Sequence, residues 1–211
     1  MKIFGLTLLL TVACVLAEPA YADDSMDKSC KQYVQEFYDW YLKKCTGVHT
    51  YDPTTEALKN KKFAFSKELQ SKLQEDHDVA QLFPGEIVGL DFDPFFNGQD
   101  MGSKYTVAYV KRVGSKYQAE VFATFDGKQS KKPDVVPELT YENAHWVFVN
   151  FLYPGASIPE NSDLLSVLKQ LKKDRPPLPN KSKAKGEAGS GAGSRAESGV
   201  RAGAKSNVHK N

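Results

Sequence analysis

The stretch from Tyr105 to Phe125 constrains the fold most, because it carries two runs of strand-like alternation joined by a short turn at Gly114. Apolar side chains at every second position are typical of a β-hairpin with one buried face. A lone hairpin is only marginally stable in water, so other elements must cover that face. The expected buried face carries Tyr105, Val107, Tyr109, Tyr117, Ala119, Val121, Ala123 and Phe125.

The first 22 residues have the features of a secretory signal peptide. One lysine precedes an almost unbroken apolar run over residues 3–17, and Ala20-Tyr21-Ala22 supplies the small residues that precede a cleavage site. We therefore expect a periplasmic or secreted protein whose mature chain begins at Asp23. A lipoprotein attached through Cys14 is the alternative, although Thr11 stands where an aliphatic residue is usual.

Residues 176–211 predict a disordered Gly/Ala/Lys-rich tail, since they contain no aromatic residue that could contribute to a core. From Lys181 onward the tail has seven Lys or Arg and two Glu, a net charge of +5, so residues 1–180 sum to −3. Weak contact with an anionic surface is the functional alternative to a solubilising tail. Basic residues scattered among Gly and Ala predict no specific recognition of nucleic acid.

Residues 23–175 have the length of one ordinary domain, and residues 25–44 predict its longest helix. Apolar side chains recur there at i, i+3, i+4 and i+7, with polar ones opposite. An unbroken helix would hold Cys30 and Cys45 roughly 22 Å apart, whereas a disulfide needs Cα atoms within about 7 Å. We expect both cysteines to stay unbridged and to pack as small core residues.

Three further helices are predicted from capping and spacing signals. Residues 54–62 form a weak candidate, residues 67–81 follow a plausible N-cap at Ser66, and a last helix begins after Ser162 and ends before Pro176. Residues 87–90 could add a short strand.

An acidic loop follows, with Asp91, Asp93 and Asp100 spread around Pro94 and Gly98. A Ca²⁺-binding loop counted from Asp91 fails at its fifth, sixth and twelfth positions. A turn in which the acidic side chains accept from local N–H groups is therefore the favoured interpretation.

Two more strands are predicted, at residues 135–141 and 145–153. Pro137 restricts the first to an edge or a bulge. The second alternates so that Phe148 and Val149 point to opposite faces, and both faces are apolar apart from Asn150. Antiparallel strands usually leave one face to solvent, so this one is expected to be covered twice.

The chain lacks a Gly-rich phosphate loop, a Walker motif, CxxC and HExxH, so we expect neither a cofactor nor a metal. His145 could line a pocket at the start of the last strand, and tyrosines could donate protons there. No catalytic set is legible. A tentative ligand pocket is assigned to Tyr38, Tyr41, Tyr109, His145 and Phe148.

Five separated segments occur in order: YVQEFYDWYLK, IVGLDFDPFFNGQD, KPDVVPEL, HWVFVNFLYP and DLLSVLKQLKKDR. Together they resemble the bacterial exported DUF3828 family, a domain of unknown function, over residues 31–175. The resemblance implies an α+β domain related to the NTF2-like cone, in which N-terminal helices pack on a curved antiparallel sheet that often encloses a pocket. It implies no catalytic residues, because the family has no settled activity.

Two functions from different classes remain open on this evidence. The first is a non-enzymatic exported domain that binds a small apolar ligand or a cell-envelope partner. The second is an NTF2-like pocket enzyme of the isomerase or hydrolase type, which needs Asp91, Asp93 or His145 to face Tyr38 or Tyr109. A homodimer that packs its sheets through Trp146, Phe148 and Phe122 is a further alternative.

Overall fold

The computed structural model describes residues 20–47, 52–158 and 162–178. The chain divides into two compact units, residues 1–175 and 176–211. Of the second unit only residues 176–178 are described, and they form no helix or strand. Most of the predicted signal peptide and nearly all of the predicted tail therefore lie outside the described residues.

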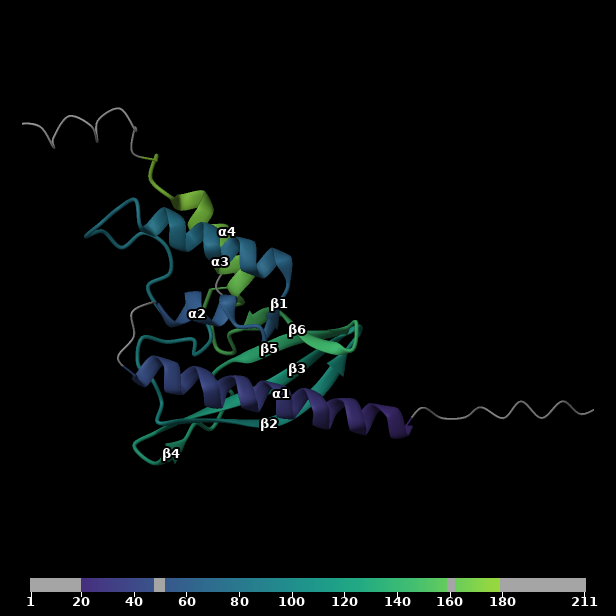
Figure 1. Ribbon diagram of the computed structural model, residues 1–211. Helices are drawn as coiled ribbons and strands as arrows, with labels where there is room; N and C mark the ends of the chain where they lie inside the picture. The colour runs from purple at the N-terminus through teal and green to yellow at the C-terminus, as the bar shows by residue number, and fades with distance from the viewer. Residues whose placement is uncertain (1–19, 48–51, 159–161, 179–211) are drawn as a thin grey trace, which may run out of the picture. The chain divides into compact units, whose positions relative to one another are not determined.

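The first unit is a mixed α+β domain whose described residues form four helices and one open sheet of six strands (Figure 1). The helices are α1 (Ala20–Thr46), α2 (Pro53–Lys59), α3 (Lys67–Ala80) and α4 (Leu164–Asp174). The strands are β1 (Ala64–Phe65), β2 (Lys104–Val113), β3 (Lys116–Phe125), β4 (Lys128–Gln129), β5 (Val136–Glu142) and β6 (His145–Leu152).

The sheet has the order β1-β6-β5-β3-β2, with β4 paired to β3. The predicted hairpin is confirmed as the antiparallel pair β2–β3. The prediction of an antiparallel sheet is wrong at one edge, because β1 runs parallel to β6 and pairs Phe65 with Phe148. A two-residue strand carries no alternation, so its pairing leaves no signal in the sequence.

Helix α1 lies across the sheet and also protects its β2 edge (Figure 1). Gln35 donates to the Tyr105 carbonyl at 3.0 Å and accepts from the Val107 N–H at 2.9 Å, and Lys31 donates to the Ala108 carbonyl at 2.8 Å. Edge strands with unpaired backbone groups invite pairing with other chains. Here polar side chains of α1 form hydrogen bonds with these backbone groups of β2.

Two bulges interrupt the alternation that the sequence predicts. In β2, Val107 faces Val121 and Val110 faces Ala119, so Ala108 and Tyr109 together oppose one residue of β3. A bulge shifts the following side chains to the other face. Val110 consequently packs against the core, while Tyr109 is 69% exposed.

The second bulge lies in β6, where Asn150 faces Glu138 and Phe148 faces Leu139, which leaves Val149 without a partner. Phe148 and Phe151 therefore share one face, with ring centroids 5.4 Å apart, instead of the opposite faces that strict alternation predicts. The prediction that β6 is covered on both faces is confirmed: Phe148 is fully buried beneath α1, and Asn150 on the other side is 8% exposed.

The termini of α3 and α4 show one correct and one wrong prediction. Ser66 caps α3 as predicted, accepting from the Leu69 N–H at 3.2 Å. Helix α4 is capped by Asp163, which accepts from the Ser166 N–H at 3.1 Å, and not by Ser162. The Asp163 carboxylate also accepts from Asn150, which explains a polar residue in an otherwise apolar strand.

Residues 87–90 form no strand, contrary to the tentative prediction, and Ile87 is 86% exposed. Within the described ranges, no helix is both long and apolar enough to cross a bilayer.

Candidate functional site

Three of the five residues predicted to line a pocket are instead part of a filled aromatic core. Tyr38, Tyr41 and Phe148 each have no exposed surface. The Phe148 ring lies 4.9 Å from that of Phe37 and 5.2 Å from that of Phe65. The Tyr38 hydroxyl donates to the Phe95 carbonyl at 2.8 Å, so its polar group is satisfied inside the core.

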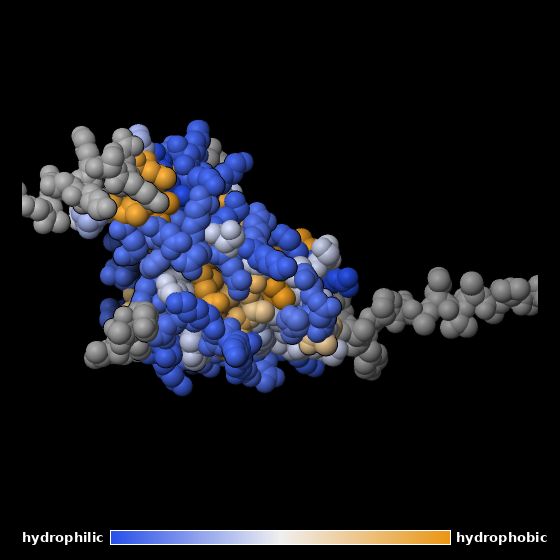
Figure 2. Space-filling model, turned by 45° about the horizontal axis from the view of Figure 1, so that its top comes forward, coloured by the Kyte–Doolittle hydropathy of each residue, from blue (hydrophilic) through white to orange (hydrophobic). Residues whose placement is uncertain are grey.

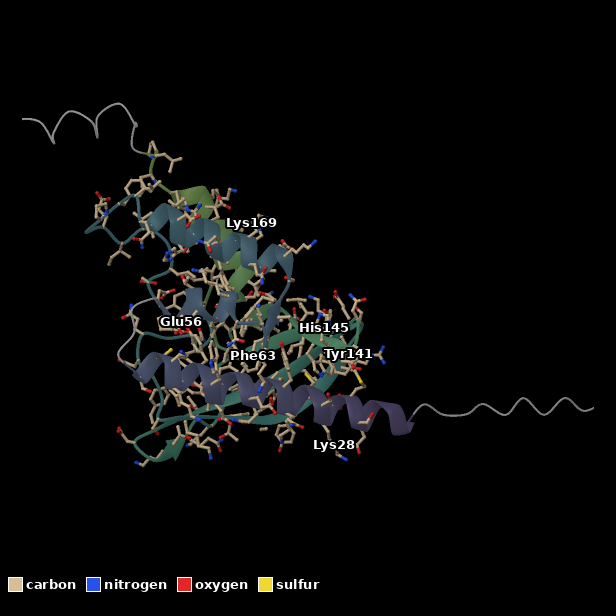
Figure 3. The ribbon with its side chains drawn as sticks, in the orientation of Figure 1. Lys28, Glu56, Phe63, Tyr141, His145 and Lys169 are labelled. Atoms are coloured by element: carbon tan, nitrogen blue, oxygen red, sulfur yellow. The ribbon has the colours of Figure 1, made fainter. Side chains whose placement is uncertain are left out.

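The other two predicted pocket residues lie on the surface, so the five do not form one pocket. The bulge in β2 directs Tyr109 to solvent. His145 is exposed beside the β5–β6 turn, where its Nδ1 lies 3.0 Å from the Asn143 carbonyl (Figure 3). Strict alternation placed Tyr109 on the wrong face, whereas His145 is exposed because it lies at the turn end of β6.

The residues suggested for a homodimer contact do not share an exposed face either. Phe148 is fully buried, and Trp146 donates from Nε1 to Ser29 of α1 at 3.0 Å. Phe122 lies on the opposite face of β3 from its buried neighbours Val121 and Ala123. A dimer through all three side chains would require α1 to leave the sheet.

The prediction of an acidic turn is confirmed at Asp93. Its Oδ1 accepts from the Phe95 and Phe96 N–H groups at 2.9 and 3.1 Å, which is an Asx-type turn. Its Oδ2 accepts from the Tyr41 hydroxyl at 2.8 Å. Burial raises the pKa of Asp93 to about 6 despite these hydrogen bonds.

Cys30 and Cys45 are both free, as predicted. Burial raises the pKa of Cys30 to about 12, and burial together with the Asp93 carboxylate raises the pKa of Cys45 to about 12. Nucleophilic reactivity needs the thiolate. Neither thiol therefore resembles a catalytic nucleophile.

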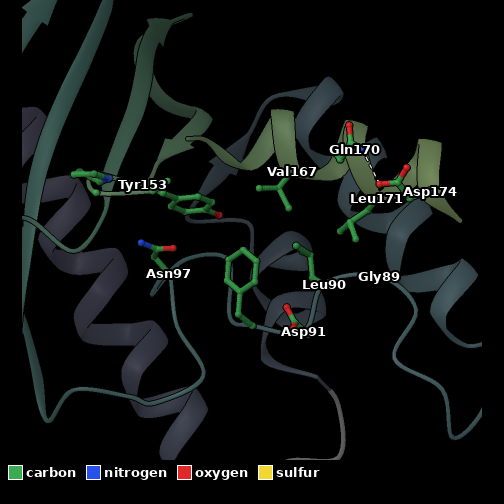
Figure 4. A pocket seen from close by; sticks show the side chains of 13 residues that line it. Gly89, Leu90, Asp91, Asn97, Tyr153, Val167, Gln170, Leu171 and Asp174 are labelled. Atoms are coloured by element: carbon green, nitrogen blue, oxygen red, sulfur yellow. Dashed lines mark hydrogen bonds between the residues drawn. The ribbon is translucent and has the colours of Figure 1, made fainter. Parts of the chain in front are cut away.

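The candidate site is a pocket between α4 and two loops, with a volume of about 430 Å³ (Figure 4). We call it the α4 pocket. Its lining comes from residues 89–92, Asn97, residues 153–156 and four residues of α4. The helical residues are Val167, Gln170, Leu171 and Asp174, which share one face because they follow i, i+3, i+4, i+7 spacing.

A buried ion pair positions one wall of the α4 pocket. Arg175, the C-cap residue that follows α4, donates to Asp76 of α3 at 2.9 Å. The second Asp76 oxygen accepts from the Leu90 N–H at 2.9 Å. Gly89 has a φ of +99°, and a Cβ there would lie 2.8 Å from that Asp76 oxygen. Only glycine therefore allows this approach, which places residues 89–92 opposite α4.

Tyr153 and Phe92 form the aromatic part of the lining. Their rings meet edge to face at 5.7 Å. The Tyr153 hydroxyl donates to the Pro94 carbonyl at 2.9 Å, which ties the strand end to the acidic loop. Asn97 donates from Nδ2 to the Asp134 carbonyl at 2.9 Å. The rings and the amide are thus held by contacts outside the cavity and do not need a ligand to fix them.

The charged side chains that line the α4 pocket are carboxylates, and Arg175 lies behind its wall, paired with Asp76. Asp91 and Asp174 line it, and Asp174 accepts from Gln170 at 2.7 Å. Two neighbouring cavities, of about 480 and 140 Å³, share Leu90 and Phe92 with it. Their linings add the carboxylates Asp52, Asp76 and Asp93 and the imidazole of His77. Within the described residues, these three linings contain no Lys or Arg.

The sequence identified part of this site. Asp91 belongs to the predicted acidic loop and lines the α4 pocket, whereas Asp100 is exposed and lies outside its lining. The stripe on α4 was not predicted as part of a site, although its i, i+3, i+4, i+7 spacing is visible in the sequence. Among the described residues no group of three or more His, Cys, Asp or Glu is placed to hold a metal ion.

No protein-family model, curated protein or solved structure matches this chain. The resemblance to the exported family therefore remains a prediction from the sequence.

Proposed function

We propose that this protein is an exported, non-enzymatic domain that binds a small, partly apolar ligand in the α4 pocket. The observation that carries the proposal is the pocket itself, which has a volume of about 430 Å³. Its lining includes the apolar side chains of Phe92, Val167 and Leu171 and a few polar groups. Small-molecule sites are typically concave, mostly apolar and lined by a small number of placed polar groups.

The fold and the location belong to the same proposal. An NTF2-like relationship would place the ligand at the end of the sheet beside α4, since the space beneath α1 is filled. Export would follow from cleavage after Ala22, with attachment through Cys14 as the alternative. The intact mass of the exported protein separates the two, because a chain beginning at Asp23 carries no lipid.

A cell-envelope protein is the alternative partner. Strand addition does not favour it, because α1 side chains occupy β2 and the other edge strand is only two residues long. The face in Figure 2 is mostly hydrophilic with few apolar patches. Leu82 and Ile87, 49% and 86% exposed in the loop after α3, are two of the exposed apolar side chains that such a partner would contact.

A pocket enzyme of the isomerase or hydrolase type is the second candidate function. Asp93 favours it, because a carboxylic acid with a pKa of about 6 suits general acid or base catalysis near neutral pH. Against it, both Asp93 oxygens already accept hydrogen bonds from Tyr41 and the loop backbone. A purely structural role for this carboxylate explains the same geometry without a substrate.

Blocking the cavity tests the binding function. Ala156 lines the α4 pocket from an exposed loop, so Ala156→Phe fills space without removing core contacts. We expect native mass spectrometry of the full chain, purified from the producing cells, to show a bound small molecule that Ala156→Phe loses. Ser115→Phe, in the exposed β2–β3 turn, is the matched control and should keep it. Equal retention by both variants would contradict the proposal.

A further inference from the structure

We propose that the ligand of the α4 pocket is an organic cation with an apolar body, such as an aryl- or alkylammonium compound. This inference rests on the proposed function and adds the chemical class of the ligand. It is carried by the combination of an aromatic and aliphatic cavity with charged lining groups that all have the same sign.

The body of the ligand is specified by the cavity wall. Phe92 and Tyr153 contribute rings to the lining. Val167 and Leu171 present aliphatic side chains on the α4 side (Figure 4). Apolar groups enter such a wall favourably because they leave water. The rings also attract a cation that lies over their faces. An apolar or aromatic ligand skeleton therefore fits this part of the wall.

The charged residues Asp91 and Asp174, which we call the rim of the pocket, determine the sign of the ligand charge. Asp91 and Asp174 contribute carboxylates from the two sides of the pocket, and no basic side chain lines it among the described residues. The lysines of α4 do not reverse this sign, because Lys172 pairs with Glu75 at 2.8 Å and neither Lys169 nor Lys173 lines the cavity. An anionic ligand would meet like charge at both residues of the rim.

Carboxylates near the pocket extend the negative electrostatic potential beyond the cavity itself. The neighbouring cavities that share Leu90 and Phe92 add Asp52 and Asp93 without a Lys or Arg in their described linings. Asp76, the remaining carboxylate, is already paired with Arg175. Clefts lined by one sign of charge concentrate ligands of the opposite sign. Residues 1–180 also sum to −3, so the domain as a whole favours a cation.

Three matched probes test the charge preference on the full chain: 2-phenylethylammonium, the neutral 2-phenylethanol and the anionic 3-phenylpropionate. Ligand-observed NMR at millimolar concentration measures all three on the same protein. We expect the cation to bind about fivefold tighter than the neutral probe, since two exposed carboxylates each contribute modestly. The anion should bind least, and added salt should narrow the difference.

Substitutions at the rim assign the preference to the named carboxylates. The double variant Asp91→Asn/Asp174→Asn keeps the cavity volume and should reduce cation binding to the level of the neutral probe. Glu120→Gln is the control, because it removes a carboxylate from β3, outside the three cavities. Equal loss in Glu120→Gln would overturn the assignment, since it would show an effect of net charge alone.

The failures of the two proposals are distinguishable. Equal binding of the three probes, or tighter binding of the anion, overturns the cation inference. The ligand-pocket proposal still stands in that case if Ala156→Phe abolishes the binding. Absence of binding by all three probes, together with no bound molecule in the purified protein, overturns both.

Discussion

The core beneath α1 is filled by aromatic rings, whereas the region between α4 and residues 89–92 leaves a cavity of about 430 Å³. The first region is held by ring contacts, such as that between Phe37 and Phe148 at 4.9 Å. The second is held by polar contacts that converge on Asp76. Apolar patterning in the sequence identified the first region and suggested a pocket there.

The difference teaches that a wide apolar face does not by itself predict a cavity. Large rings on α1 and β6 interdigitate and fill the space between helix and sheet. At the other end, Gly155 and Ala156 are too small to reach α4, and Gly89 admits a close backbone approach. A cavity remains where small residues in loops face a helix.

The largest expected effect is in the filled core. Phe148→Ala should lower the free energy of unfolding by about 3–5 kcal/mol, because the ring is fully buried and leaves a cavity behind. Val149→Ala, at the bulge position and only partly buried, should cost less than about 1.5 kcal/mol. Denaturant unfolding of both variants at two protein concentrations measures this.

A nearly neutral Phe148→Ala would contradict the filled core and restore the pocket predicted from the sequence. A cost that depends on protein concentration would instead indicate that Phe148 lies at a subunit interface.

The next effect concerns the polar contacts beside the α4 pocket. Arg175→Ala should cost about 3 kcal/mol, because Asp76, 4% exposed, would lose its charged partner. Lys172→Ala is the control, since that lysine pairs with Glu75 at an exposed position and should cost less than about 1 kcal/mol. Equal costs in the two variants would show that burial of the Asp76 pair contributes nothing.

A smaller effect is expected from Asp93, which lies at the border between the two regions. Its pKa in the folded protein, about 6, is above the ordinary value of 3.8, so folding favours the neutral form. The stabilisation associated with that neutral form is present at low pH and lost as the pH rises through about 6. Asp93→Asn removes this titration while keeping an oxygen for the turn.

The free energy of unfolding of Asp93→Asn relative to the unmodified protein should therefore rise by about 2 kcal/mol between pH 4 and pH 7. The difference between the proteins is the quantity to compare. Glu36 and Glu75, whose pKa values are lowered by hydrogen bonds from Lys62 and Lys172, give the opposite trend in both. A difference independent of pH would show that Asp93 titrates normally.

The sequence predicted the elements better than their register. Helix spacing located α1 and the Ser66 cap of α3, and alternation located β2, β3 and β6. The parallel β1 pairing was not predictable, because two residues carry no period. The α4 pocket was not predictable either, since it depends on long-range contacts such as Arg175 to Asp76.

Bulges explain why candidate residues were misplaced. An extra residue in one strand moves every later side chain to the other face of the sheet. No residue type in β2 or β6 indicates in the sequence that a bulge is present. Tyr109 was thereby assigned to the core side and Phe151 to the side opposite Phe148.

The smallest expected effect tests the β2 bulge directly. Tyr109→Ser should change the free energy of unfolding by less than about 0.5 kcal/mol, because the side chain is 69% exposed. Val110→Ser should cost clearly more, since Val110 packs against the core on the far side of the bulge. Strict alternation predicts the reverse order, with Tyr109 buried and Val110 exposed. Denaturant unfolding of the two variants therefore distinguishes the registers, and a larger cost for Tyr109→Ser would return that tyrosine to the core side of the sheet.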